Sequence, residues 1–311
     1  MKEGVFVLYP NRLRKGDRVG VIAPAGPPDQ ESLLKGVSFL EKELDLKIKL
    51  GKHINSAYGY LAGKDEERLN DFHEMVKDPD IQGIIFARGG YGTSRIASQI
   101  DYELIKQNPK VIWGYSDITY LHTTIRQTTG LITFHGPMVA TDMANKQFDE
   151  KSKKMFNQLF EPTELHYTEE YSKLEVLNEG KSFGQLVGGN LSLLTSTIGT
   201  PFEIDTKDNL LLLEDIGEVP YRIDAMLNQL KHAGKLDDVA GIIIGDFAKA
   251  TPKKDSLSLK EVFNHYFAEL DCPVMCGFKI GHCFPHFAVP LGTWATMDTS
   301  NKTLLVKPGI Q

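Results

Sequence analysis

Along the first half of the chain, short apolar runs alternate with longer segments in which apolar residues recur every three or four positions. The apolar runs predict strands over residues 18–23, 47–50, 83–87 and 111–113. The periodic segments predict helices over residues 31–44, over 65–76 and after Ser116. The run at 83–87 is apolar throughout, which is typical of a strand buried on both faces of a parallel sheet. This alternation predicts an open parallel α/β sheet of the flavodoxin or Rossmann type.

The second half has a different pattern, which predicts a smaller C-terminal mixed α/β domain. Residues 146–180 are polar and charged, so we expect a helix and a linker there. Beyond them, apolar strands at 209–213 and 241–245 flank a helical pattern over 221–233, and alternation over 290–308 predicts antiparallel strands. We therefore expect an N-terminal domain over residues 1–145, a connection over 146–180 and a C-terminal domain over 181–311.

Composition excludes several functional classes. A net charge of −6 over 311 residues argues against a nucleic-acid-binding protein, which needs a basic surface to displace phosphate counterions. No apolar run approaches the ~20 residues that span a bilayer. The apolar stretch before Pro10 is too short for a secretion signal. We therefore expect a cytoplasmic protein that binds neither nucleic acid nor membrane.

The strand predicted at 111–113 leads through Gly114 to Ser116, where a helical pattern begins. A serine at a strand-to-helix corner stands clear of its neighbours and near the positive end of the helix dipole, which suits a nucleophile. The Gly-x-Ser-x-Gly elbow is only half met, because Ile118 occupies the second glycine position. An ordinary helix N-cap at Ser116 is therefore the alternative.

A serine nucleophile needs a base to take its proton and an acid to orient that base. Of the nine histidines, His135 ends a predicted strand, and His282 follows one over 274–280 beside a glycine. Both are candidates for the base, while His286 reads equally well as a loop residue. His122, further along the helix, points away from the corner.

For the acid, Glu214 ends an apolar run over 210–213. A carboxylate buried there needs a partner, and an imidazole N–H would serve. Asp215 and Glu218 are the competitors, although Asp215 would also suit the loop backbone and Glu218 the start of the following helix. The chain order Ser116, Glu214, His282 matches the nucleophile–acid–base order of α/β-hydrolases.

The glycine-rich segment 88–92 follows another predicted strand end and allows three interpretations. It lacks the phosphate-loop and dinucleotide-binding signatures, so we expect no nucleotide cofactor, and a plain tight turn would need no function. As an oxyanion hole, it would offer the backbone amide of Gly90, with that of Asp117 as the second donor. Arg88 and Gly89 would then bind substrate, with Arg88 as a fork for a carboxylate.

Cys272, Cys276 and Cys283 lie near His282 and His286, which raises the question of a metal site. Zinc needs four converging ligands, and these spacings match no standard zinc motif. An odd number of cysteines also makes no disulfide framework. We therefore expect reduced, packed thiols and no metal.

Together these segments resemble the LD-carboxypeptidase family of cytoplasmic murein tetrapeptide carboxypeptidases. The resemblance covers nearly the whole chain and follows the family's order through segments 22–26, 88–92, 114–117, 135–137, 188–191, 199–201, 213–216, 220–223, 281–282 and 290–292. The family is metal-independent and uses a Ser-His-Glu triad, which the resemblance places on Ser116, His282 and Glu214. It also implies two domains, with the serine on the N-terminal one and the other two members on the C-terminal one, and a homodimer.

The resemblance implies a serine carboxypeptidase that hydrolyses an L,D-peptide bond and releases a C-terminal D-amino acid, D-Ala, from murein tetrapeptides in cell-wall recycling. A sister branch, which hydrolyses peptidyl-nucleotide antibiotics of the microcin C type, resembles the chain at the triad too. Segment 188–191 and the compact C-terminal half are more similar to the murein enzymes. The non-enzymatic alternative is a module that binds a peptide between the domains. The family's Gly-His-Gly or Gly-His-Glu stretch reads Gly281-His282-Cys283 here.

Overall fold

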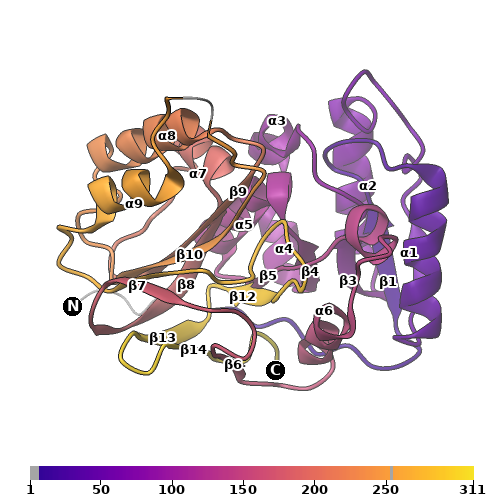
Figure 1. Cartoon of the computed structure of the whole chain (residues 1–311). Coiled ribbons are helices and arrows are strands. Elements are labelled where there is room, and N and C mark those ends of the chain that lie inside the picture. Colours follow the sequence, from indigo (N-terminus) through magenta and orange to yellow (C-terminus); the bar gives the residue numbers. More distant parts are fainter. Residues whose placement is uncertain (1–6, 253–254) are drawn as a thin grey trace.

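The computed structural model describes residues 7–252 and 255–311, which form two sheets with helices packed against them (Figure 1). The first sheet has six strands, which in spatial order are β2 (Lys47–Leu50), β1 (Arg18–Ile22), β3 (Ile81–Phe86), β4 (Val111–Gly114), β5 (Thr133–His135) and β12 (Val289–Leu291). The first five are parallel, and β12 pairs antiparallel with β5. The order 2-1-3-4-5 is that of a flavodoxin-like doubly wound sheet, which confirms the predicted fold class.

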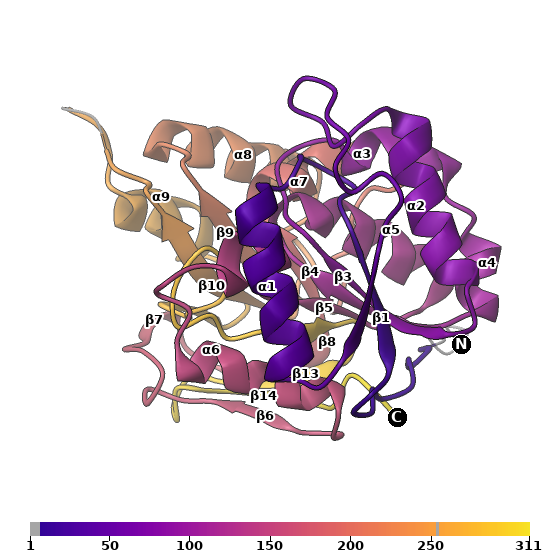
Figure 2. The same cartoon turned by 90° about the vertical axis from the view of Figure 1, so that its right-hand side faces the viewer.

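The helices of the first half cover both faces of this sheet. They are α1 (Gln30–Lys42), α2 (Asp65–Lys77), α3 (Thr93–Ile96), α4 (Tyr102–Gln107) and α5 (Thr119–Thr129). Figure 2 shows α1 lying across the sheet. Along β3, Ile85 belongs to the core cluster that contains Leu40 of α1, whereas Ile84 and Phe86 belong to the cluster that contains Phe72 of α2. The strand is therefore buried on both faces, as its continuous apolar run predicts.

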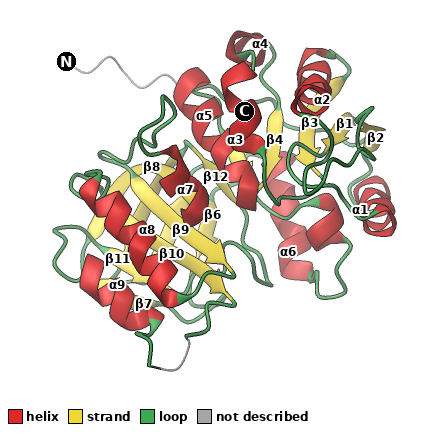
Figure 3. Cartoon of the chain, turned by 90° about the horizontal axis from the view of Figure 1, so that it is seen from above, coloured by secondary structure: helices red, strands yellow, loops and turns green. Residues whose placement is uncertain are grey.

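The second sheet has eight strands with a parallel centre and antiparallel edges. In spatial order they are β6 (Leu165–Tyr167), β14 (Thr303–Val306), β13 (Trp294–Asp298), β8 (Lys181–Asn190), β9 (Leu210–Ile216), β10 (Gly241–Ala248), β11 (Val274–Cys276) and β7 (Glu175–Asn178). Helices α7 (Leu191–Thr197), α8 (Pro220–His232) and α9 (Leu259–Phe267) lie over its strands (Figure 3). Their apolar side chains share a core with Leu211 and Leu213 of β9 and Ile242 and Ile244 of β10.

The connection over 146–180 contains more structure than the predicted helix and linker. It forms α6 (Glu150–Lys154), but it also supplies β6 and β7, the two edges of the second sheet. These strands have three and four residues and partly exposed side chains, so they carry little apolar pattern of their own. Their partners β14 and β11 come much later in the chain, and only tertiary pairing defines them.

Near the C-terminus, the antiparallel strands predicted over 290–308 are present as β13 and β14. The strand predicted over 274–280 is shorter, because β11 ends at Cys276 and a loop leads on to His282. The chain then crosses to the first sheet as β12 before it returns to the second. This crossing ties the two sheets together. No helix among the described residues has the length and apolar character that a membrane crossing requires.

Candidate active site

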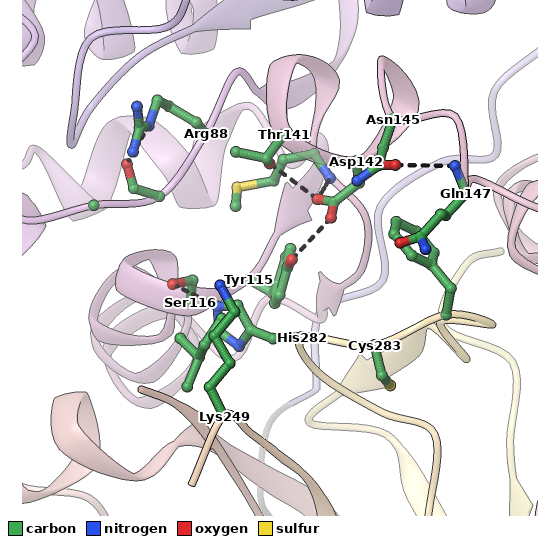
Figure 4. A pocket seen from close by; sticks show the side chains of 15 residues that line it. Arg88, Tyr115, Ser116, Thr141, Asp142, Asn145, Gln147, Lys249, His282 and Cys283 are labelled. Carbon is green, nitrogen blue, oxygen red and sulfur yellow. Dashed lines mark hydrogen bonds between the residues drawn. The ribbon is translucent and has the colours of Figure 1, made fainter. Parts of the chain in front are cut away.

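Ser116 lies two residues after the end of β4, at the corner that leads into α5 (Figure 4). Its backbone φ is +63°, a left-handed conformation that residues other than glycine seldom adopt. Such strain at a strand-to-helix corner is typical of an exposed nucleophile. Ser116 begins a 3-10 turn over Ser116–Ile118, and no side-chain cap hydrogen bond starts this turn or α5. The structure therefore does not support the alternative of a helix N-cap.

Glycines let a second loop approach this corner closely. A Cβ atom on Gly89 would lie 3.0 Å from Ser116 Oγ, and one on Gly114 would lie 2.8 Å from the Phe86 ring. Hydrogen bonds from Thr93 to the Asp117 carboxylate (3.0 Å) and carbonyl (2.7 Å) hold the two loops together. The structure thus brings segment 88–92 to Ser116, as expected for the carboxyl ends of neighbouring parallel strands.

The second sheet brings an imidazole and a carboxylate to the same corner. His282 Nε2 lies 3.1 Å from Ser116 Oγ, and His282 Nδ1 lies 2.7 Å from Glu214 Oε2. Glu214 is part of β9, and His282 lies in the loop between β11 and β12. A Cβ atom on Gly281 would lie 2.5 Å from Glu214 Oε2, so a glycine before His282 is required for this approach. Figure 4 shows Ser116 and His282 facing each other at the pocket wall.

Burial and charge shift the pKa values of Glu214 and His282. Glu214 is fully buried, and burial raises the pKa of its carboxyl group, although His282 opposes that shift. Burial by itself lowers the pKa of the His282 imidazole, but the neighbouring carboxylates, Glu214 foremost and then Asp142 and Asp215, together raise the pKa above its ordinary value. With Nδ1–H donated to Glu214, Nε2 is left to accept the serine proton. We call Ser116, His282 and Glu214 the hydrogen-bonded triad.

The competing residues have other partners. His135 is buried against the Tyr115 ring, with ring centroids 5.5 Å apart, and burial holds its pKa well below the ordinary value. Asp215 accepts hydrogen bonds from the side chain of Asn190 (3.1 Å) and from Ser192 N (2.8 Å), so it bonds the backbone at the start of α7 instead of the loop backbone. Glu218 pairs with Arg222 of α8 at 3.7 Å. Within the described parts of the chain, none of these three side chains forms a hydrogen bond with the side chain of Ser116 or His282.

The Arg88 side chain lines the pocket, but its guanidinium is engaged with backbone. It donates hydrogen bonds to the carbonyl oxygens of Gly89 and Pro27, each at 3.2 Å. Arg88 therefore fastens the loop after β1 to the glycine-rich loop. Gly89 and Gly90 also line the pocket, and Gly90 has a φ of +122° that favours glycine.

The pocket has a volume of about 750 Å³ and contains residues that the sequence patterns do not reveal. Tyr115 packs its ring 4.7 Å from that of His282 and donates a hydrogen bond to Asp142 at 2.9 Å. Burial raises the pKa of Asp142, which also accepts hydrogen bonds from Met138 N and from a threonine hydroxyl. Lys249 lines the pocket after β10. The rule that points to Ser116, namely a polar side chain at a strand end, could have indicated Lys249 as well.

The cysteines do not assemble with the histidines into a metal site. Cys272 and Cys276 pack against the core beneath α8 and α9, and burial raises the pKa of the Cys272 thiol to about 11. Cys283 lines the pocket, where burial also raises its pKa. His286 is buried, and its pKa is lowered to about 3. In the described parts of the chain, no three His, Cys, Asp or Glu side chains are grouped to hold a metal ion.

Comparisons with known proteins identify the family. Residues 19–136 match the LD-carboxypeptidase N-terminal domain, and residues 183–297 match the LD-carboxypeptidase C-terminal domain. The chain is 54% identical over 312 residues to a protein of Bacillus subtilis (strain 168) named "Probable murein peptide carboxypeptidase", with 99% of this chain and 98% of that protein covered.

Solved structures show the same fold. The crystal structure of muramoyltetrapeptide carboxypeptidase from Oxalobacter formigenes superposes with a TM-score of 0.84 at 25% identity, covering 94% of this chain and 100% of that one. Microcin C7 self-immunity protein MccF in its wild-type apo state superposes with a TM-score of 0.91 at 26% identity, covering 98% and 100%. The family models cover well over half of the sequence and confirm the resemblance seen in its motifs. The chain belongs to the LD-carboxypeptidase family.

Proposed function

We propose that this protein is a serine carboxypeptidase that hydrolyses an L,D-peptide bond and releases D-Ala from the C-terminus of murein tetrapeptides. Family membership and the 54% identical relative named for murein peptides support this substrate class. The observation that carries the chemistry is the hydrogen-bonded triad, which joins both sheets at the wall of one pocket.

In this mechanism, Ser116 Oγ attacks the scissile carbonyl carbon while His282 Nε2 takes the hydroxyl proton. Glu214 holds the imidazole in the required tautomer and stabilises the imidazolium. The backbone amides of Gly90 and Asp117 would bind the oxyanion, a contribution worth roughly 3–4 kcal/mol per donor in comparable sites. His282 then protonates the departing amine of D-Ala, and a water molecule activated by the same imidazole hydrolyses the acyl-enzyme.

The test is mass spectrometry of a murein tetrapeptide incubated with the protein and with a Ser116→Ala variant. The wild type should release D-Ala, whereas the variant should lose about 10⁴- to 10⁶-fold in kcat. A circular dichroism spectrum like that of the wild type would show that the variant folds. If the wild-type protein returns the tetrapeptide whole, it is a binding module and the proposal is wrong.

A second candidate is hydrolysis of a peptidyl-nucleotide antibiotic of the microcin C type. It is favoured by the superposition on MccF, and one MccF structure is a complex with glutamyl sulfamoyl guanosine. Mass spectrometry of a peptidyl-nucleotide incubated with the protein tests this candidate, since an antibiotic hydrolase would release an aminoacyl-nucleotide fragment from it. We place it second because the relative named for murein peptides is 54% identical to this chain, whereas MccF is 26% identical.

The family resemblance also supports two finer proposals, a cytoplasmic location and a homodimer. Sedimentation of the purified protein tests the second proposal directly. A molecular mass of two chains is expected, and a mass of one chain at micromolar concentration would contradict it.

A further inference from the structure

Lys249 follows directly after β10 and extends toward the side of the pocket that holds Ser116 and His282 (Figure 4). Strand β10 lies between β9, which carries Glu214, and β11, which leads toward His282. These three strands are parallel, so their carboxyl ends meet at one edge of the sheet. Lys249 therefore belongs to the same sheet edge as two members of the triad.

The backbone fixes the position from which this side chain leaves. Lys249 has a φ of +57°, a left-handed conformation that is energetically unfavourable for a lysine. Ala248 O accepts a hydrogen bond from Gly217 N at 2.8 Å, and Lys249 O accepts one from Thr251 N at 2.9 Å. Gly217 directly follows β9, so the turn is tied to the strand that carries Glu214.

Arg88 and Lys249 both line the pocket, but their side chains differ in the contacts they already make. Arg88 donates to the carbonyls of Gly89 and Pro27. Lys249 forms no ion pair and no side-chain hydrogen bond with any residue in 7–252 or 255–311. The acid of the pocket, Asp142, is occupied by hydrogen bonds of its own. The ammonium of Lys249 is thus the cation that remains available for an anion entering the pocket.

We propose that Lys249 binds the C-terminal carboxylate of the peptide substrate and thereby restricts cleavage to the last residue. This inference rests on the proposed carboxypeptidase function. In a peptide held for attack by Ser116, the terminal carboxylate is one residue from the scissile carbonyl, a span of roughly 3.5 Å. An anchor must therefore stand in the same pocket as the nucleophile. A lysine suits the task, because its compact charge is carried on a long flexible stem.

The test compares two substrates, a tetrapeptide ending in D-Ala and the same peptide with a C-terminal amide. The variant is Lys249→Asn, because asparagine tolerates a left-handed backbone and removes the charge. Lys302→Asn is the matched control: Lys302 also has a positive φ, of +50°, but lies in the turn between β13 and β14 and pairs with Glu169. The wild type should prefer the free acid. Lys249→Asn should lose about 10- to 100-fold in kcat/KM on the acid alone. Lys302→Asn should leave kcat/KM unchanged on both substrates.

The outcomes separate this inference from the proposed function. If the wild type releases D-Ala and Lys249→Asn keeps its preference for the acid, the anchor is elsewhere and the inference is wrong. An Arg88→Met variant is assayed on the same two substrates. If it loses the preference for the acid while Lys249→Asn keeps it, Arg88 is the anchor and the inference is wrong. If the wild type releases no D-Ala, the proposed function fails and the inference falls with it.

Two further measurements guard against a folding defect. Lys249→Gly relaxes the backbone while removing the charge, and it should show the same loss on the acid. Calorimetry in a Ser116→Ala background measures binding of the acid and the amide without turnover. There, adding Lys249→Asn should weaken binding of the acid and leave binding of the amide unchanged. Equal weakening of both would contradict a carboxylate anchor.

Discussion

Ser116 follows a strand of the first sheet and is positioned by the backbone of a single corner, whereas Glu214 from the second sheet and His282 from the loop after β11 depend on each other. The corner is local: β4 ends, φ at Ser116 turns positive, and α5 begins within a few residues. Glu214 and His282 meet only because strand β9 and the loop after β11, which are distant in sequence, converge, with Gly281 leaving room for the contact. The nucleophile is therefore a property of local sequence, and the acid–base pair is a property of tertiary structure.

The largest predicted effect concerns whether the two regions act as one unit. We expect Ser116→Ala and His282→Ala each to lower kcat by about 10⁴- to 10⁶-fold, and the double variant to be no slower than either. Each removal leaves the remaining partner without a role in proton transfer. Single-turnover kinetics on a tetrapeptide ending in D-Ala measures the three rates. Losses that multiply in the double variant would show that the two sheets contribute independently.

The interaction of Glu214 with His282 should also set the pH dependence of activity. Catalysis requires neutral His282, so activity should fall as the pH drops through the pKa of this imidazole. Glu214 contributes most among the carboxylates that raise that pKa against the effect of burial, and Asp142 and Asp215 add to it. Glu214→Gln removes the negative charge, so the pKa of His282 should fall and the acidic limb should move to lower pH.

NMR titration of His282 in a Ser116→Ala background reads this pKa without relying on turnover. The charge-conserving variant Glu214→Asp is the control, and its titration should stay nearer that of the parent. An unchanged His282 pKa in Glu214→Gln would mean that the carboxylate does not govern the imidazole.

Apolar patterns predict the interior of both sheets but not the way in which the sheets join. The continuous runs at β3, β9 and β10 bury both faces, and each is visible in the sequence. Edge strands β6 and β7 are short and partly exposed, and β12 crosses to the other sheet, so tertiary pairing alone defines them.

The candidate site, too, is only partly predictable from local sequence. Ser116 and Glu214 stand at strand ends that the pattern reveals, and a glycine marks His282 in its motif. The hydrogen bond between Tyr115 and Asp142 depends on a loop folding back over the sheet, which no local pattern encodes. In the sequence, only the family resemblance favours His282 over His135, because both lie at the end of a predicted strand.

A smaller effect is expected from crowding the acid–base pair. Gly281 has a φ of +117°, and a Cβ there would lie 2.5 Å from Glu214 Oε2. We expect Gly281→Ala to lower the free energy of unfolding by about 2–4 kcal/mol, from backbone strain and overpacking together. Gly217→Ala is the control, since its φ is +77° but no atom lies within 4 Å of the added Cβ, and it should cost about 1 kcal/mol. Urea denaturation of both variants checks the difference, and equal losses would show that the crowding is without consequence.

The smallest expected effect is that of metal removal. Activation of Ser116 needs only His282 and Glu214, which already share hydrogen bonds across the two sheets. Treatment with EDTA followed by gel filtration should therefore leave kcat/KM on the tetrapeptide unchanged. The control is a metal analysis of the protein before and after treatment, which shows whether any ion was present to be removed. Activity that is lost with the metal and restored by zinc would assign a role to Cys272, Cys276 and Cys283, and would make the second region a metal centre instead of an acid–base pair.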